Sequence, residues 1–241
     1  MIELTALRGL PEVRAGDDLA ALLAACGTEL RTGDVLVVAH KVVSKAEGRV
    51  VRLADVTPSP RALELARAHG KDPRAVEVIL SEATEVVRAD AGRLICRTRH
   101  GFVCANAGVD ASNAGEPGTL VLLPADPDAS ARALRARLGC AVVISDSFGR
   151  AWRKGQCEVA IGCAGLAPLR DYRGEPDTDG REMHASVIAI ADEAAAAADL
   201  ARTKTSREPA VRVRGLEPYV LDHDGPGATA LVRAWADDLF R

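Results

Sequence analysis

The sequence predicts an α+β fold with mixed sheets and flanking helices. Short apolar runs typical of strands alternate with capped helical segments, but without the regular strand–helix–strand repeat of a doubly wound parallel sheet. Hydrophobic residues make up 48% and charged residues 27% of the 241 residues, which is typical of a folded globular protein. Because no internal repeat, low-complexity tract or long linker interrupts it, we expect residues 1–241 to form one domain.

Capping residues mark the helices in the first half of the chain. Asp17 or Asp18 is placed to cap a helix that ends near Cys26. Ser59-Pro60 and Asp72-Pro73 each begin a short helix, because proline is tolerated at the first helical position. β-Branched and apolar runs predict strands at residues 34–39, 49–53, 94–98, 101–105 and 119–123.

The second half continues the alternation. Asp126-Pro127 begins a helix that ends near residue 138. A buried strand over residues 141–145 is expected to end abruptly at Asp146, a position well suited to chemistry at the carboxyl end of a strand. Further elements are expected as an exposed excursion at 169–182, a helix at 186–202, a strand at 210–214 and a helix at 229–240.

Composition excludes several classes of protein. The 31 basic and 34 acidic side chains leave a net charge of -3, which argues against a nucleic-acid partner. The longest apolar runs fall far short of the roughly 20 residues that span a bilayer, so no membrane association is expected. The six cysteines lack CxxC spacing and the amino terminus lacks a secretory pattern, which favours reduced thiols and a cytoplasmic protein.

Residues 106–113 form the first candidate binding loop, because short polar side chains and glycine replace packing residues there. Asp110 offers a hard anionic oxygen suited to Mg²⁺ or Mn²⁺. Ser112 and Asn113 offer neutral donors and acceptors for a phosphate or sugar. The same composition is also typical of a solvated turn.

Residues 145–156 form the second candidate site. Asp146 and Ser147 are able to bind a divalent cation, and Arg150 and Arg153 to neutralise a phosphate or carboxylate. An ordinary basic loop held by surface ion pairs is the alternative. Two separate Asp-containing loops together with a basic cluster favour a site for a nucleotide and metal.

Residues 40–48 follow a buried strand and place Lys45 where its ammonium group reaches a phosphate. The chain contains neither the P-loop pattern nor G-x-G-x-x-G, so a nucleotide site must have another design. No H-E-x-x-H pair supports a catalytic zinc, and no G-x-S-x-G supports a serine hydrolase.

Four blocks in order resemble the coenzyme F-420:L-glutamate ligase family, the γ-glutamyl ligases of deazaflavin coenzyme biosynthesis. They are LPEV at 10–13, KVVSKAEG at 41–48, ANAGVDASN at 105–113 and DSFGRAWR at 146–153. The resemblance extends over residues 2 to about 216. It implies a family-specific α+β fold, an intertwined homodimer, GTP as the nucleotide and two divalent ions, Mg²⁺ or Mn²⁺, with a monovalent cation as a further candidate. No C-terminal reductase domain is expected.

The resemblance also implies roles for individual residues. It makes Asp110 and Asp146 ligands of one metal ion and Ser147 a ligand of the second. It places Leu10, Pro11, Glu12, Val13, His40, Lys45 and Asn113 around GTP. His40 stands where the family pattern has a small hydroxyl residue. The resemblance also implies that residues 202–208 approach the nucleotide and the second metal, but this stretch matches too weakly for individual roles.

The implied reaction joins the amine of L-glutamate to a carboxylate of the deazaflavin coenzyme precursor through an acyl phosphate, and then adds glutamate through a γ-linkage. Lys45, Arg150 and Arg153 are the candidate catalytic residues, because cations stabilise the charge of phosphoryl transfer. A related acid–amino acid ligase with another acceptor and a non-catalytic GTP-binding scaffold are the alternatives.

Overall fold

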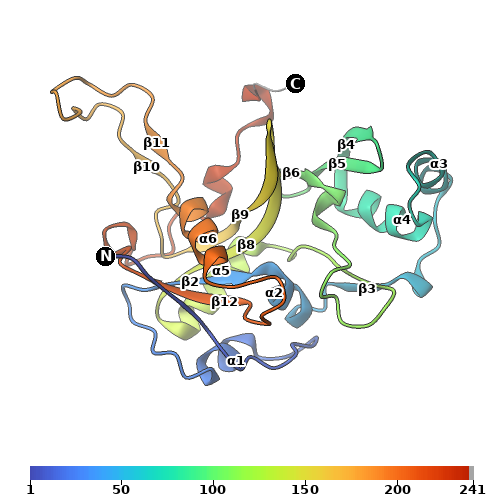
Figure 1. The fold of residues 1–241 in the computed structure, drawn as a ribbon, viewed down its shortest axis with the longest axis horizontal. Helices are drawn as coiled ribbons and strands as arrows, with labels where there is room; N and C mark the ends of the chain where they lie inside the picture. Colours follow the sequence, from blue (N-terminus) through green and yellow to red (C-terminus); the bar gives the residue numbers. More distant parts are fainter. Residues whose placement is uncertain (239–241) are drawn as a thin grey trace.

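A computed structural model describes residues 1–238 and is built around a five-stranded sheet (Figure 1). The strand order is β1 (Glu3–Ala6), β12 (Ala210–Arg214), β2 (Val35–Ala39), β8 (Ala141–Arg150) and β9 (Arg153–Ala164). The pairing of β2 with β8 is parallel, whereas the other three pairings are antiparallel. The predicted mixed sheet is therefore confirmed, and it joins segments from both ends of the described chain.

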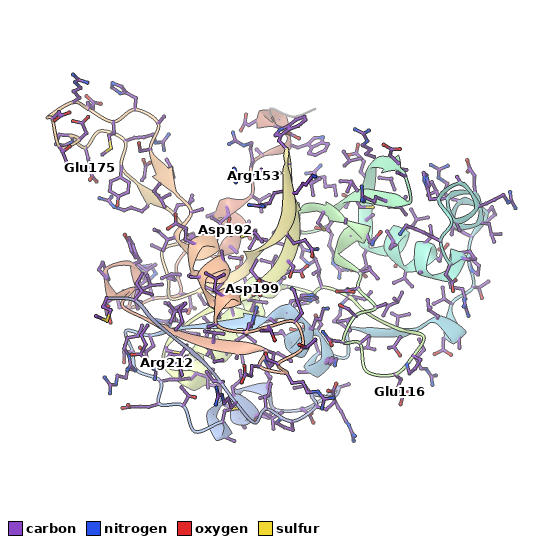
Figure 2. The ribbon with its side chains drawn as sticks, in the orientation of Figure 1. Glu116, Arg153, Glu175, Asp192, Asp199 and Arg212 are labelled. Carbon is purple, nitrogen blue, oxygen red and sulfur yellow. The ribbon has the colours of Figure 1, made fainter. Side chains whose placement is uncertain are left out.

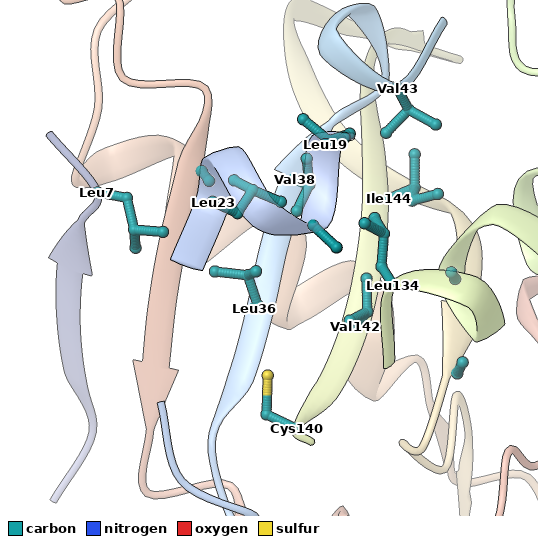
Figure 3. Close-up of a cluster of buried hydrophobic side chains, with 14 of the residues drawn as sticks. Leu7, Leu19, Leu23, Leu36, Val38, Val43, Leu134, Cys140, Val142 and Ile144 are labelled. Atoms are coloured by element: carbon teal, nitrogen blue, oxygen red, sulfur yellow. The ribbon is translucent and has the colours of Figure 1, made fainter. Parts of the chain in front are cut away.

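Helices cover both faces of this sheet. The alternation of side chains along β2 directs Leu36 and Val38 toward α1 (Leu19–Ala25), α2 (His40–Ala46) and α5 (Pro127–Leu138), as Figure 3 shows. Val35 and Val37 point to the other face, where they pack with α6 (Ile190–Leu200). Because both faces of β2 are buried, the strand is apolar throughout.

A second group of elements has its own hydrophobic core, shown at the right of Figure 1. It contains α3 (Pro60–His69), α4 (Pro73–Glu82), β3 (Val50–Arg52), β4 (Ala83–Asp90), β5 (Arg93–Thr98), β6 (Val103–Ala105) and β7 (Thr119–Val121). β4, β5 and β6 form one antiparallel sheet and β3 pairs with β7 in another. The β6–β7 connection carries the Asp110 loop back toward the five-stranded sheet.

The helix starts predicted from capping residues are confirmed. Asp18, Ser59 and Asp72 each accept a hydrogen bond from a backbone N–H in the first turn of the helix that follows, and Asp126 does the same for α5. The strands expected near residues 34–39, 49–53 and 210–214 correspond to β2, β3 and β12. Local sequence suffices at these places because the signal lies within a few residues.

The prediction that a strand ends at Asp146 is wrong. β8 continues to Arg150, because residues 146–150 pair with β9 as a long two-stranded ribbon. A register shift between Ile144 and Ser145 marks where this ribbon begins to depart from the sheet. The expected loop at 145–156 is thus largely a hairpin that extends beyond the sheet (Figure 1).

The predicted helix over 229–240 is also wrong within the described residues, and residues 239–240 lie outside them. Two short 3₁₀ turns, Ala228–Leu231 and Trp235–Asp237, replace it. Asp128 accepts hydrogen bonds from Ala228 N and Thr229 Oγ1, both over 2.7 Å, and fixes a turn. Tertiary contacts therefore override the helical pattern in this segment.

The exposed excursion predicted at 169–182 is confirmed as an arm that starts at β10 (Arg170–Asp171) and returns at β11 (Val187–Ile188). Because β11 takes up residues 187–188, α6 starts later than the predicted 186. No helix within residues 1–238 has the length and apolar character needed to span a bilayer.

Candidate active site

The carboxyl ends of β2 and β8 lie side by side because these two strands are parallel neighbours. Ala39 pairs with Ser145, so His40 at the start of α2 comes beside Asp146. His40 Nε2 lies 3.3 Å from Asp146 Oδ1, and His40 Nδ1 lies 3.3 Å from Ser44 Oγ. The His40 side chain is only 2% exposed, and its Nε2 makes no hydrogen bond. Buried polar atoms normally have a polar partner, and the Asp146 carboxylate is the polar group beside this one.

Lys41 brings the second predicted carboxylate to the same end of α2. Its Nζ donates to Asp110 Oδ2 over 2.6 Å, to Ser112 Oγ over 2.6 Å and to the Ser112 carbonyl over 2.9 Å. Because His40 and Lys41 are consecutive, Asp146 and Asp110 both contact the first turn of α2. A metal site shared by the two carboxylates stays a prediction.

The Asp110 carboxylate is held ionised by its neighbours. Burial alone raises the pKa of Asp110, but the hydrogen bonds from Lys41 and from Ser112 outweigh that effect and lower it. The backbone of Asp110 is fixed by two hydrogen bonds with Val121 of β7. Asn113 lies in the same exposed loop and has a left-handed backbone conformation with φ of 54°.

Ser147 belongs to a second polar group on the β8–β9 ribbon. It lies opposite Glu158 in the ladder, and its hydroxyl donates to Glu158 Oε1. The Lys204 ammonium contacts Ser147 Oγ and lies 3.3 Å from Glu158 Oε1. The buried Arg202 donates to Glu158 Oε2 and to Ser145 Oγ, both over 3.1 Å.

Glu158 is the centre of this group and its side chain is 4% exposed. Burial raises the pKa of the carboxyl, but hydrogen bonds from Ser145 and Ser147 and the charges of Arg202 and Lys204 lower it overall. A buried carboxylate with two cationic partners is a typical arrangement at a site that handles charged substrates.

No individual role was predicted for Lys41, Glu158, Arg202 or Lys204. Lys41 has a recognisable signal, since it directly follows His40 at the end of a buried strand. Arg202 and Lys204 lie in the stretch 202–208, and they reach the site only because the segment after α6 passes the ribbon. Such long-range proximity has no signature in local spacing.

The amino-terminal segment contacts α2. Lys45 in the last turn of α2 forms an ion pair with Glu12 over 2.5 Å. Val13 is buried in the main core, Leu10 packs against it, and Pro11 is exposed. Leu10 and Val13 therefore hold the two ends of this segment against the main core, and Pro11 and Glu12 between them are exposed to solvent.

Arg150 and Arg153 lie apart from the two carboxylates. Both are exposed at the end of the β8–β9 ribbon, where Arg150 Nη2 donates to the Lys154 carbonyl over 2.6 Å. Figure 2 shows Arg153 near this end of the ribbon. Arg150 follows Asp146 by four strand residues, a span of about 13 Å along the chain. The structure does not bring these two arginines together with Asp110 and Asp146.

Comparisons with known proteins agree on one family. The sequence profile described as F420-0:gamma-glutamyl ligase matches residues 9–215. A protein of Methanopyrus kandleri named coenzyme F420:L-glutamate ligase is 48% identical, over 95% of this chain and 94% of its own. Proteins of the same name from Methanothermobacter thermautotrophicus and Halobacterium salinarum are 44% and 46% identical, over 100% and 98% of this chain.

Proposed function

The chain belongs to the F420-0:gamma-glutamyl ligase family, and on that premise we propose that it is a GTP-dependent ligase that adds L-glutamate to F420-0, the deazaflavin coenzyme precursor. The observation that supports this best is the pair Asp110 and Asp146, which reach the first turn of α2 through its consecutive residues His40 and Lys41. Phosphoryl transfer needs positioned charges around the phosphates more than it needs covalent chemistry from the protein.

Divalent ions fit the chemistry of this donor set. Asp110, Asp146 and Ser147 offer the hard oxygens that Mg²⁺ and Mn²⁺ prefer, and the His40 nitrogen beside Asp146 has no hydrogen bond. Within residues 1–238, no three His, Cys, Asp or Glu side chains cluster closely enough to hold a metal ion. The remaining ligands would be water and phosphate oxygens, as is usual for magnesium–nucleotide sites. Two such ions would neutralise phosphate charge when bound.

Lysine ammonium groups lie at both sets of oxygens. Lys41 contacts Asp110 and Ser112, and Lys204 contacts Ser147 and Glu158. These contacts support the metal assignment, because each set of oxygens already attracts a cation. In the proposed reaction, Lys41 and Lys204 would move from these oxygens to phosphate oxygens once metal ions are present.

The proposed nucleotide site runs along α2. The segment of residues 10–13, with His40, Lys45 and Asn113, would surround GTP, and Lys45 would exchange Glu12 for a phosphate. The catalytic role of Arg150 and Arg153 stays a prediction, as do the homodimer, the cytoplasmic location and the monovalent cation.

The proposed chemistry has two steps. A carboxylate oxygen of the acceptor attacks the γ-phosphorus of GTP, which gives an acyl phosphate and releases GDP. The amine of L-glutamate then attacks the acyl carbon, phosphate leaves, and the amide forms as the amine loses a proton. Lys41, Lys45 and Lys204 would stabilise the transferred phosphoryl group, because fixed cations lower the barrier where negative charge accumulates.

One incubation tests the proposal. The protein is mixed with GTP, Mg²⁺ or Mn²⁺, L-glutamate and F420-0, and the product mass and the released GDP are measured. A gain of one or more glutamates, with one GDP for each, is the expected result. GTP that stays bound without hydrolysis would instead support a scaffold role, and glutamate addition to another acid alone would indicate a different acceptor.

A further inference from the structure

A groove of about 440 Å³ lies beside the edge strand β9 and is not used by the nucleotide and metal residues. Its walls come from the turn before β6, from the β8–β9 ribbon, from α6 and from the segment after residue 230. Figure 2 shows Asp192 on α6 beside the β8–β9 ribbon, and Arg153 toward the upper end of that ribbon. This volume falls in the range of about 300–1,000 Å³ that is usual for small-molecule sites.

The groove gathers aromatic side chains in a chain that has few of them. The sequence contains only two Trp, two Tyr and three Phe, yet Phe102, Phe148 and Trp235 all line this groove. The Phe102 and Phe148 rings meet edge to face with centroids 6.1 Å apart. Aromatic walls favour a flat, apolar ligand, because rings bury large areas and stack with little loss of conformational freedom.

Charged groups at the groove add polar selectivity. The Arg97 guanidinium lies 4.6 Å from the centroid of the Trp235 ring, and Arg233 lines the same groove. Asp192 Oδ1 accepts a hydrogen bond from Ala160 N over 2.8 Å, which fixes the carboxyl in the wall. The wall therefore offers acceptor oxygens for a ring N–H and cations for an anionic tail.

The groove is adjacent to Asp146 of the candidate active site. Val159, which lines the groove, pairs directly with Asp146 across the β8–β9 ladder. Phe148 follows Asp146 by two residues and so lies on the same face of β8.

We propose that this groove holds the flat deazaflavin ring of F420-0, with its carboxylate tail directed along the ribbon toward Asp146. The inference rests on the proposed function and specifies where its acceptor binds. Phe148 and Trp235 contact the ring faces, Asp192 accepts a hydrogen bond from the imide N–H of the ring, and Arg97 and Arg233 lie beside the anionic tail.

The two tryptophans provide a matched test. F420-0 binding is measured by titration calorimetry with the wild-type protein, with Trp235→Ala and with Trp152→Ala, since Trp152 is 87% exposed at the end of the ribbon. We expect Trp235→Ala to weaken F420-0 binding by about tenfold or more, as for loss of one stacked aromatic, and to leave GTP affinity unchanged. Trp152→Ala should bind F420-0 as the wild type does.

Two further variants keep the result interpretable if Trp235→Ala fails to fold. Trp235→Phe retains a ring and should lose less affinity, and Asp192→Asn should weaken F420-0 binding without affecting GTP. Unchanged F420-0 affinity in Trp235→Phe, Asp192→Asn and any folded Trp235→Ala would overturn the groove assignment alone. The assignment would also be overturned if these variants changed only the oligomeric state, because the groove would then be an interface with a second copy of the chain. Absence of F420-0 binding to the wild type would overturn the proposed function as well.

Discussion

The Lys41 ammonium group donates a hydrogen bond to Asp110 Oδ2 over 2.6 Å, although the two residues lie 69 positions apart in the sequence. The same nitrogen contacts two oxygens of Ser112, so it occupies a three-oxygen environment. An ammonium ion at these oxygens competes with any divalent cation that uses the Asp110 carboxylate.

Lys41→Met is therefore expected to tighten binding of Mn²⁺ to the nucleotide-free protein by roughly threefold to tenfold, because it removes the competing charge. Electron paramagnetic resonance of free Mn²⁺ during titration measures the affinity. Lys154→Met at the end of the ribbon is the control and should change nothing, while Asp110→Asn should weaken binding. Equal affinities in the wild type and Lys41→Met would show that this ammonium does not compete with the metal ion.

GTP affinity is expected to depend on divalent metal, because Asp110 and Asp146 would repel the phosphates if no cation lay between them. Calorimetric titration with and without a chelator measures the difference.

Asp146→Asn keeps the shape of the side chain and should lower ligase turnover at least about a hundredfold while leaving the unfolding temperature unchanged. A variant that lost stability but kept its turnover per folded molecule would assign Asp146 a structural role.

Asp34→Asn is expected to destabilise the protein by about 2 kcal/mol at neutral pH, because it removes the charge of a buried carboxylate from its hydrogen bonds with the partly exposed Arg214. Asp34 accepts from Arg214 Nε and Nη2 over 2.7 and 2.8 Å. Urea unfolding measures the loss, and Asp55→Asn in the exposed pair with Arg52 should cost less than about 1 kcal/mol.

The same ion pair predicts a direction for the pH dependence. Burial raises the Asp34 pKa, but the Arg214 hydrogen bonds and the Arg31 N–H outweigh it and lower the pKa in the folded state. A lowered folded pKa gives stability that is present above the pKa of the unfolded chain and is lost as the pH falls through the folded value. The difference between wild type and Asp34→Asn should therefore shrink in acid, and a constant difference would contradict this.

Three buried thiols are expected to resist alkylation in the native protein. Burial raises the pKa of Cys104 and of Cys163 to about 12 and that of Cys140 to about 11, so little thiolate is present near pH 8. Iodoacetamide should label the half-buried Cys157 first, as peptide mass spectrometry will report. Equally fast labelling of Cys163 would mean that the sheet opens readily around it.

The product is expected to carry one or two glutamates, with every linkage beyond the first through the γ-carboxylate. After one addition, both the α- and γ-carboxylates of the new residue are available, but only one can lie in line with the GTP γ-phosphate beside the carboxylate site. Fragmentation mass spectrometry identifies the linkage. A mixture of α- and γ-linked products would contradict this positioning argument.

Sequence reasoning succeeded where the signal is local. Asp18, Ser59 and Asp72 begin helices through hydrogen bonds that span two or three residues, and β2 is apolar because both of its faces are buried. The family resemblance also pointed to Asp110 and Asp146, and the structure places both at the start of α2.

Sequence reasoning failed where pairing between distant segments decides the conformation. The residues from Ser147 to Arg150 include a serine and a glycine and lack the apolar pattern of a strand. They are nevertheless part of β8, because they pair with residues 153–158 of β9. Glu158 gains its partners Arg202 and Lys204 only when the segment after α6 folds back, and no spacing rule connects them. The segment after residue 228 has a helical sequence pattern but forms short 3₁₀ turns, because Asp128 accepts hydrogen bonds from Ala228 and Thr229.

The position of β2 between β12 and β8 also constrains when this protein is able to fold during synthesis. β2 is made early, but both of its neighbours in the sheet are translated much later, and β12 lies in the last part of the described chain. Until those neighbours are synthesised, β2 is an apolar segment of the nascent chain with unpaired backbone groups along both edges. Such a segment is prone to pair with strands of other chains. The nascent chain is thus expected to need chaperone protection until β12 emerges. Completion of the sheet, which also positions the candidate site at the start of α2, is then a late step.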